Sequence, residues 1–245
     1  MSIAEQNNGL PAKGTLYGVG VGPGDPELIT LKALRIIRET PVLAWPAPLE
    51  GDSMARTIAA EHLDGHHHEI PIRMPMEVAR FPAQQVYDVA TDEITAELDR
   101  GRDVAVLCEG DPFFYGSFMH IYARVKDHVP TDVVPAITGM SGAWTATGAP
   151  ITWGDDVLTV LMGTLGEEKL TKHIEETDAL VIMKIGTNFE KVIRALKAGG
   201  KYDDAYLVQF ATMGGKQTVN KLSEVTEKVT PYFSIIVVHG QGRRP

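Results

Sequence analysis

Two spacings of apolar residues alternate along this chain. Between residues 26 and 37 apolar side chains recur every three positions, and between 83 and 98 every four, which predicts amphipathic helices. Continuous apolar runs at 41–45 and 103–107 predict buried strands. The same reasoning adds helices at 53–62 and 118–125 and strands at 16–21, 69–72 and 133–135. This alternation predicts a parallel sheet covered by helices on both faces.

A change of composition between residues 138 and 156, where small residues and two tryptophans gather, divides the chain. Beyond it, the pattern predicts a second sheet from strands at 157–162, 179–183, 206–210 and 234–238, with helices at 169–176 and 189–198. We therefore expect an N-terminal α/β domain over 1–139, with 1–13 as a flexible tail, and a C-terminal α/β domain over 140–245. A trough between the two domains is the expected ligand site.

Composition and charge narrow the class of partner. The chain has 245 residues, of which 44% are hydrophobic, and a net charge of −9, which disfavours a nucleic-acid partner. No run approaches the length of a membrane span and no signal sequence precedes the pattern, so a cytoplasmic protein without a membrane partner is expected. The single cysteine, Cys108, ends an apolar run and is expected to be a buried core residue.

Four glycines alternate over residues 18–24, directly after the first apolar run. Without Cβ atoms, they allow backbone to approach a bound molecule closely. A Rossmann fingerprint would need a third glycine at position 23 or 25, where Pro23 and Asp25 stand, and no P-loop Gly-Lys-Ser/Thr follows. The loop therefore predicts a ligand site of another kind, or a tight turn without a ligand. Asp25 and Pro26 are also expected to begin the helix at 26–37 as its N-cap and first residue.

A second polar segment, Glu-Gly-Asp-Pro-Phe-Phe-Tyr-Gly-Ser at 109–117, follows the buried run at 103–107. Ligands in open parallel sheets bind beyond the carboxyl ends of strands, so Asp111 and Tyr115 are expected near the same edge as Asp25. Capping of the next helix is the alternative role for Asp111. The run at 66–68 contains three consecutive histidines, which cannot all face one ion, so a solvated turn and no bound metal are expected.

The segments Gly-Val-Gly-Pro-Gly-Asp at 20–25, Gly-Asp-Pro-Phe at 110–113 and Pro-Ala-Ile-Thr at 135–138 resemble, in their order and separation, the tetrapyrrole methylases. These are S-adenosylmethionine-dependent enzymes of cobalamin and sirohaem synthesis. The longer segment 16–33, with 181–184, 211–213 and 231–234, is most similar to the branch that methylates C20 of precorrin-2. The resemblance runs from about Gly14 to the end of the chain.

The resemblance implies a two-domain tetrapyrrole methylase fold, each domain a mixed, mostly parallel sheet flanked by helices, and not a Rossmann methyltransferase. It implies a homodimer with S-adenosylmethionine in the trough. Residues carried over as cofactor-binding are Pro23, Gly110, Asp111, Pro112, Tyr115, Thr138, Gly139, Met183, Lys184, Ala211 and Thr212. Residues placed at the substrate are Gly22, Gly24 and Asp25.

Two departures from the family pattern affect the loops. Ala136 stands where many relatives have glycine, and Met183-Lys184-Ile185-Gly186 stands where the branch common to sirohaem enzymes has a Tyr-Met-Gly ending. Asp111 is the first candidate for the base that takes the proton from C20, and Tyr232 is a weaker candidate to orient or assist.

The implied reaction is methyl transfer from S-adenosylmethionine to C20 of precorrin-2, giving precorrin-3A and S-adenosylhomocysteine in cobalamin biosynthesis. The alternatives are a cobalt-precorrin-2 C20-methyltransferase of the anaerobic route and a non-catalytic tetrapyrrole-binding or carrier protein. Methylation of uroporphyrinogen is disfavoured by the sequence of the first glycine segment. The sulfonium of the cofactor already makes the methyl group electrophilic, so no protein-bound metal is expected to take part.

Overall fold

The computed structural model describes residues 12–74 and 80–242, so most of the expected tail at 1–13 lies outside the described residues. The chain divides into two compact units. The first contains the described residues up to Gly22 and those from Pro26 to Ile137, and the second contains Pro23–Asp25 and the described residues from Thr138 onward. The glycine loop thus leaves the first unit at Gly22 and returns to it at Pro26.

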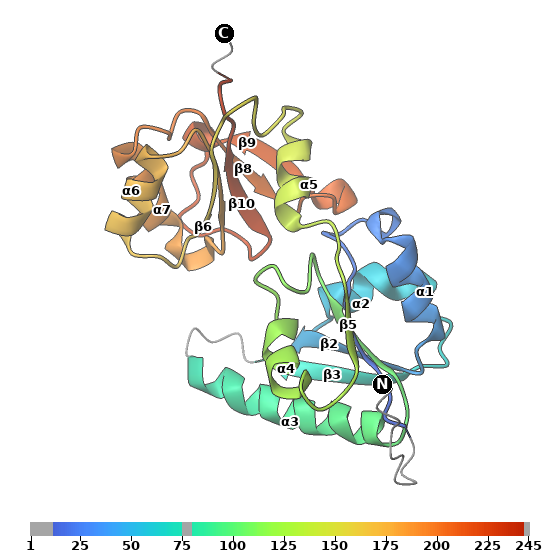
Figure 1. Ribbon diagram of the computed structural model, residues 1–245. Helices are drawn as coiled ribbons and strands as arrows, with labels where there is room; N and C mark the ends of the chain where they lie inside the picture. The colour runs from blue at the N-terminus through green and yellow to red at the C-terminus, as the bar shows by residue number, and fades with distance from the viewer. Residues whose placement is uncertain (1–11, 75–79, 243–245) are drawn as a thin grey trace, which may run out of the picture. The chain divides into compact units, whose positions relative to one another are not determined.

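The first unit is built on a five-stranded sheet in the order β3-β2-β4-β1-β5. Figure 1 labels three of these strands, β2, β3 and β5. Every pairing in this sheet is parallel, as the continuous apolar runs predict. The strands are β1 (Leu16–Gly20), β2 (Val42–Pro48), β3 (His68–Met74), β4 (Val104–Cys108) and β5 (Thr131–Val134). Because β4 is the central strand, the segment that follows it begins midway along the row of strand carboxyl ends.

Helices cover both faces of this sheet. Helices α3 (Arg80–Asp99) and α4 (Phe118–Val125) pack on the face to which Val106 and Cys108 contribute. Helices α1 (Leu31–Glu39) and α2 (Met54–Ala59) pack on the face to which Ala105 and Leu107 contribute, and α2 continues as the short 3-10 helix η2 (Ala60–His62). Alternate residues of β4 therefore serve two cores, which explains its unbroken apolar sequence.

The first helix begins later than the sequence analysis expects. Residues Pro26–Leu28 form a 3-10 turn, η1, and α1 starts only after Thr30. The Thr30 hydroxyl accepts a hydrogen bond from the backbone N–H of Ala33 at 3.2 Å and so provides the N-cap. The prediction that Asp25 caps this helix is wrong, because a threonine closer to the apolar stripe takes that place.

The second unit contains a five-stranded sheet in the order β6-β7-β10-β8-β9. Only β6 and β7 pair in parallel, while the other three pairings are antiparallel. The strands are β6 (Leu158–Met162), β7 (Ala179–Met183), β8 (Ala205–Gln209), β9 (Thr218–Lys221) and β10 (Ser234–Val238). The two-domain α/β class is confirmed, with more antiparallel pairing in this sheet than expected.

Helices also cover both faces of the second sheet. Helices α6 (Glu167–Glu175) and α7 (Phe189–Ala198) form the larger core with β7 and β10, and α5 (Gly139–Ala146) packs on the other face against Val208 and Val237. The remaining short 3-10 helices are η3 (Gly186–Asn188), η4 (Gly214–Lys216) and η5 (Leu222–Glu224). Within the described ranges, no helix combines the length and apolar character that a membrane crossing needs.

Candidate functional site

The carboxyl ends of β1 and β4 are joined directly to each other in the first unit. Gly22 and Gly110 form an isolated antiparallel bridge, in which the Gly110 N–H donates to the Gly22 carbonyl at 2.8 Å. Both residues have positive φ, 81° and 70°, in the region where a side chain would be strained. The two loops predicted to bind ligand are therefore joined by a backbone hydrogen bond at the carboxyl ends of their strands.

Asp111 connects this edge to a third strand end. Its Oδ1 accepts the backbone N–H of Phe113 at 2.9 Å, and its Oδ2 accepts the backbone N–H of Ala136, just after β5, at 3.0 Å. Both carboxylate oxygens thus hold backbone in place. This geometry includes the turn-capping role that the sequence left open, and it adds a link between two loops.

Gly20 leaves no room for a side chain between these loops. A Cβ atom on Gly20 would lie 2.4 Å from the Cβ of Ala136 and 2.6 Å from the carbonyl oxygen of Gly110. We expect Gly20→Ala to destabilise the protein by about 1–3 kcal/mol, because neither neighbour is a flexible side-chain end. Urea unfolding measures this loss. Gly215→Ala is the matched control, since a Cβ there meets nothing within 4 Å, and equal stability of the two variants would contradict the prediction.

Glu109 is the residue at this edge that the sequence analysis missed. It stands between the buried end of β4 and Gly110 and is itself half-buried. Within the described residues it makes no hydrogen bond or ion pair. Burial alone raises the pKa of its carboxyl to about 7. An acid directly after a fully apolar strand was the available sequence signal.

Cys108, one residue earlier, is buried and forms no disulfide, and its thiol donates to the Val106 carbonyl at 3.7 Å. Burial raises the pKa of its thiol to about 12, so it stays protonated and inert at neutral pH. The expectation that Cys108 is a core residue is confirmed, and the polar group of this strand end is Glu109.

In the second unit, the tip of the glycine loop packs on the segment after β8. The Asp25 N–H donates to the Thr212 hydroxyl at 3.2 Å. A Cβ atom on Gly24 would lie 2.5 Å from Cγ of Met213 and 3.0 Å from the Thr212 hydroxyl. Three residues predicted at the substrate or cofactor, Gly24, Asp25 and Thr212, are therefore brought together within this unit.

Helix α5 contributes to the same cluster. A Cβ on Gly142 would lie 2.9 Å from Cγ2 of Thr212 and 3.5 Å from both Ala211 and Pro23. The helix begins at Gly139 after Thr138, whose hydroxyl accepts the Ser141 N–H at 3.4 Å. Helix α5, which the sequence analysis did not predict, thus brings Gly142 against three of the proposed cofactor residues, Pro23, Ala211 and Thr212. Two others, Thr138 and Gly139, stand at the start of the same helix.

Unusual backbone conformations mark the predicted cofactor residues. Four non-glycine residues of the described chain have positive φ: Tyr115 (56°), Lys184 (53°), Phe210 (52°) and Thr212 (66°). Three of these were predicted to bind cofactor, and Phe210 immediately precedes another, Ala211. Such conformations cost free energy, most clearly for a β-branched threonine, and they gather at ligand sites.

The remaining predicted residues follow other strand ends. Met183 ends β7 and is half-buried, and the exposed Lys184 follows it. Pro112 lies within the Asp111 turn, next to the Gly20 backbone. Tyr232 lies just before β10, is 64% exposed, and packs edge-on against Phe233 at 5.1 Å between ring centroids. Tyr232 is thus open to solvent beside the strand that pairs with both β7 and β8.

Each unit is an α/β domain with strained backbone in loops that follow its strands, and the glycine loop lacks the spacing of a Rossmann fingerprint. A family model described as Tetrapyrrole (Corrin/Porphyrin) Methylases matches residues 15–226. The chain belongs to the tetrapyrrole methylase family, and the expected enzyme class, a methyltransferase, is confirmed.

Two curated relatives make the resemblance more specific. The chain is 40% identical over 240 residues to a precorrin-2 C(20)-methyltransferase of Sinorhizobium sp, covering 95% of this chain and 98% of that protein. It is 28% identical over 230 residues to a cobalt-precorrin-2 C(20)-methyltransferase of Salmonella typhimurium, covering 93% and 97%.

Solved structures share the fold. A cobalt precorrin-4 methyltransferase aligns with a TM-score of 0.71 at 22% identity, over 97% of this chain and 98% of that one. A uroporphyrin-III C-methyltransferase from Thermus thermophilus, solved with S-adenyl homocysteine, aligns with a TM-score of 0.66 at 21% identity, over 92% of each chain. The tetrapyrrole methylase fold is confirmed.

Proposed function

We propose that this chain transfers a methyl group from S-adenosylmethionine to C20 of precorrin-2, in cobalamin biosynthesis. The family supports a tetrapyrrole substrate, and the precorrin-2 relative is 40% identical whereas the cobalt-precorrin-2 relative is 28% identical. This difference favours the metal-free substrate over its cobalt form. We also propose that the protein is cytoplasmic and that it forms a homodimer. The mass in dilute solution tests the dimer and should be twice that of one chain.

The observation that carries the site is the positive φ of Tyr115, Lys184 and Thr212, three residues predicted to bind cofactor. Strained backbone conformations are found preferentially at ligand sites, which supports this assignment. We assign the methionine and ribose parts of S-adenosylmethionine to the segment 110–115 with Thr138 and Gly139. We assign its nucleoside to Met183, Lys184, Ala211 and Thr212, with Pro23 beside them. The tetrapyrrole is assigned to Gly22, Gly24 and Asp25.

The chemistry requires alignment and one proton acceptor. The bound S-adenosylmethionine supplies an electrophilic methyl group, and the protein holds the nucleophilic carbon in line with it and excludes water. After C20 bonds to the methyl carbon, C20 must lose a proton to a base. Tyr232 is assigned an orienting role at the substrate.

We propose Glu109 as this base, with Asp111 as the alternative. Asp111 uses both carboxylate oxygens to hold backbone amides, whereas Glu109 has no hydrogen bond or ion pair among the described residues. A carboxyl that titrates near neutral pH is suited to accept a proton and release it in each turnover. In this scheme Asp111 positions the cofactor loop.

Incubation with labelled S-adenosylmethionine and either metal-free precorrin-2 or its cobalt form tests the function. We expect label to enter the metal-free tetrapyrrole faster. A faster reaction with the cobalt form would assign the anaerobic route instead. Label in neither would support the non-catalytic binding or carrier protein.

A further inference from the structure

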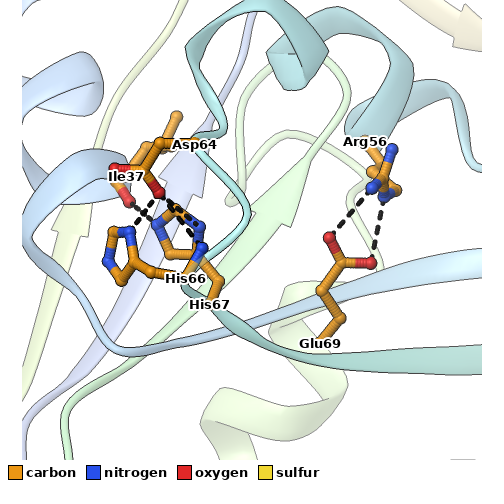
Figure 2. A network of polar contacts seen from close by, with 6 residues as sticks. All are labelled: Ile37, Arg56, Asp64, His66, His67 and Glu69. Atoms are coloured by element: carbon orange, nitrogen blue, oxygen red, sulfur yellow. Dashed lines mark hydrogen bonds and ion pairs between the residues drawn. The ribbon is translucent and has the colours of Figure 1, made fainter.

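Three potential metal ligands lie together in the loop between η2 and β3, at residues 63–67. The ligand atoms of Asp64, His66 and His67 all lie within 4.8 Å of one another. Figure 2 shows the Asp64 carboxylate facing Nδ1 of both imidazole rings, whose centroids lie 3.9 Å apart. The sequence analysis expected a solvated turn here, but the structure groups two of the three histidines with a carboxylate.

His67 is the residue that distinguishes this loop from a solvated turn. Its side chain is only 1% exposed. Its Nε2 lies 2.9 Å from the carbonyl oxygen of Ile37, in α1, so the ring donates its proton there. That bond leaves Nδ1 as a lone-pair atom, and this buried atom has no hydrogen-bond partner. It lies 3.8 Å from Oδ1 of Asp64.

This arrangement has the features of a built metal site. Metal-binding histidines commonly donate their second ring N–H to a carbonyl, which fixes the tautomer and the ring orientation, and Ile37 does this for His67. The Asp64 carboxylate also accepts the His66 backbone N–H at 3.2 Å, which holds the loop in its folded form. The carboxylate of Glu69 binds Arg56 through contacts of 2.9 and 3.2 Å (Figure 2) and does not belong to the ligand set.

We propose that Asp64, His66 and His67 bind one divalent transition-metal ion of the zinc class, through one carboxylate oxygen and the Nδ1 atoms of both rings. Two imidazoles and one carboxylate, with water in the remaining position, are a common zinc ligand set. Magnesium and calcium prefer oxygen ligands and do not fit two imidazoles. This loop precedes β3, whereas the glycine and Asp111 loops follow their strands. In this parallel sheet the metal therefore lies at the amino ends of the strands, opposite those two loops. Its role is to stabilise the loop that binds it.

Titration of the untagged full chain with Zn²⁺, in competition with a chromophoric chelator, tests the site. We expect the wild type to bind about one equivalent and its melting temperature to rise with Zn²⁺, because the ion binds only the folded loop. Asp64→Asn and His66→Gln should each weaken binding at least tenfold. Asparagine keeps an oxygen that can accept the His66 N–H, and both side chains are exposed, so the metal-free variants should melt like the metal-free wild type.

His68→Gln is the matched control, since His68 is the next residue in the same histidine run and lies outside the cluster. It should bind Zn²⁺ like the wild type. Absence of binding by the wild type would overturn the proposal. Equal losses in the His66 and His68 variants would also overturn it, because they would reveal unspecific binding to a histidine run.

Discussion

Replacing Glu109 with glutamine is expected to lower kcat by about 10²- to 10⁴-fold, the range typical of a lost general base. Glutamine keeps the size of the side chain but cannot accept the proton that C20 releases. The wild-type rate should rise with pH through about 7, where the carboxyl ionises. The residual activity of the variant should not show this rise. Initial rates of methyl transfer from pH 5.5 to 8.5 measure both effects.

The same change should make the protein more stable at alkaline pH. The folded-state pKa of Glu109, about 7, lies above its ordinary value of 4.5, so its contribution to stability is present below pH 4.5 and is lost as pH rises through 7. The wild type should therefore lose up to about 3 kcal/mol of unfolding free energy from this group by pH 8. Glu109→Gln should avoid that loss, and urea unfolding at pH 5 and pH 8 compares the two proteins.

A variant that is more stable but far less active would mark Glu109 as functional. Glu93→Gln is the matched control, because Glu93 is an exposed acid on α3. It should leave the rate, its pH dependence and the stability unchanged. Normal turnover by Glu109→Gln would remove Glu109 from the mechanism and return the role of base to Asp111.

Asp111→Asn is expected to cut turnover by orders of magnitude for a different reason. The asparagine amide has a single acceptor oxygen, so one of the N–H groups of Phe113 and Ala136 would face an NH₂ group. A lost bond to a charged acceptor costs about 1.5–3 kcal/mol, and we expect a fall in stability of that order with the fold retained. Because the loop between β4 and α4 and its link to the segment after β5 loosen, affinity for S-adenosylmethionine should fall as well.

Calorimetric titration with S-adenosylhomocysteine separates the two acids. Asp111→Asn should bind it more weakly, whereas Glu109→Gln should bind it like the wild type. Asp92→Asn, an exposed acid on α3, is the control for Asp111. Near-normal activity of Asp111→Asn would dispose of both roles proposed for this residue.

The apolar spacing was sufficient to predict most of the elements and the two-sheet class. A strand such as β4 consists only of apolar residues, so its sequence alone predicts that it is buried in the sheet. Helix α5 was not predicted because its sequence, which includes two glycines, has no apolar stripe. Its packing on Val208 and Val237 stabilises it instead. The short edge strand β9 escaped for a similar reason, since it is mostly polar.

Motif spacing indicated which loops matter but not what each side chain does. Asp111 was predicted as a site residue, yet its two backbone hydrogen bonds depend on where β5 ends, which no local pattern records. Glu109 gains its raised pKa from burial in the folded chain. His67 is similar, because its ring bonds to the Ile37 carbonyl, 30 residues earlier, which no local pattern indicates.

The position of the transferred methyl group tests the central claim most directly. The wild type would be incubated with metal-free precorrin-2 and S-adenosylmethionine labelled with ¹³C in its methyl group, and the product examined by ¹³C NMR. We predict a single new labelled methyl, bonded to the bridge carbon C20. A labelled methyl on a pyrrole ring carbon, or an unlabelled tetrapyrrole, would contradict the assignment of this chain as a C20-methyltransferase.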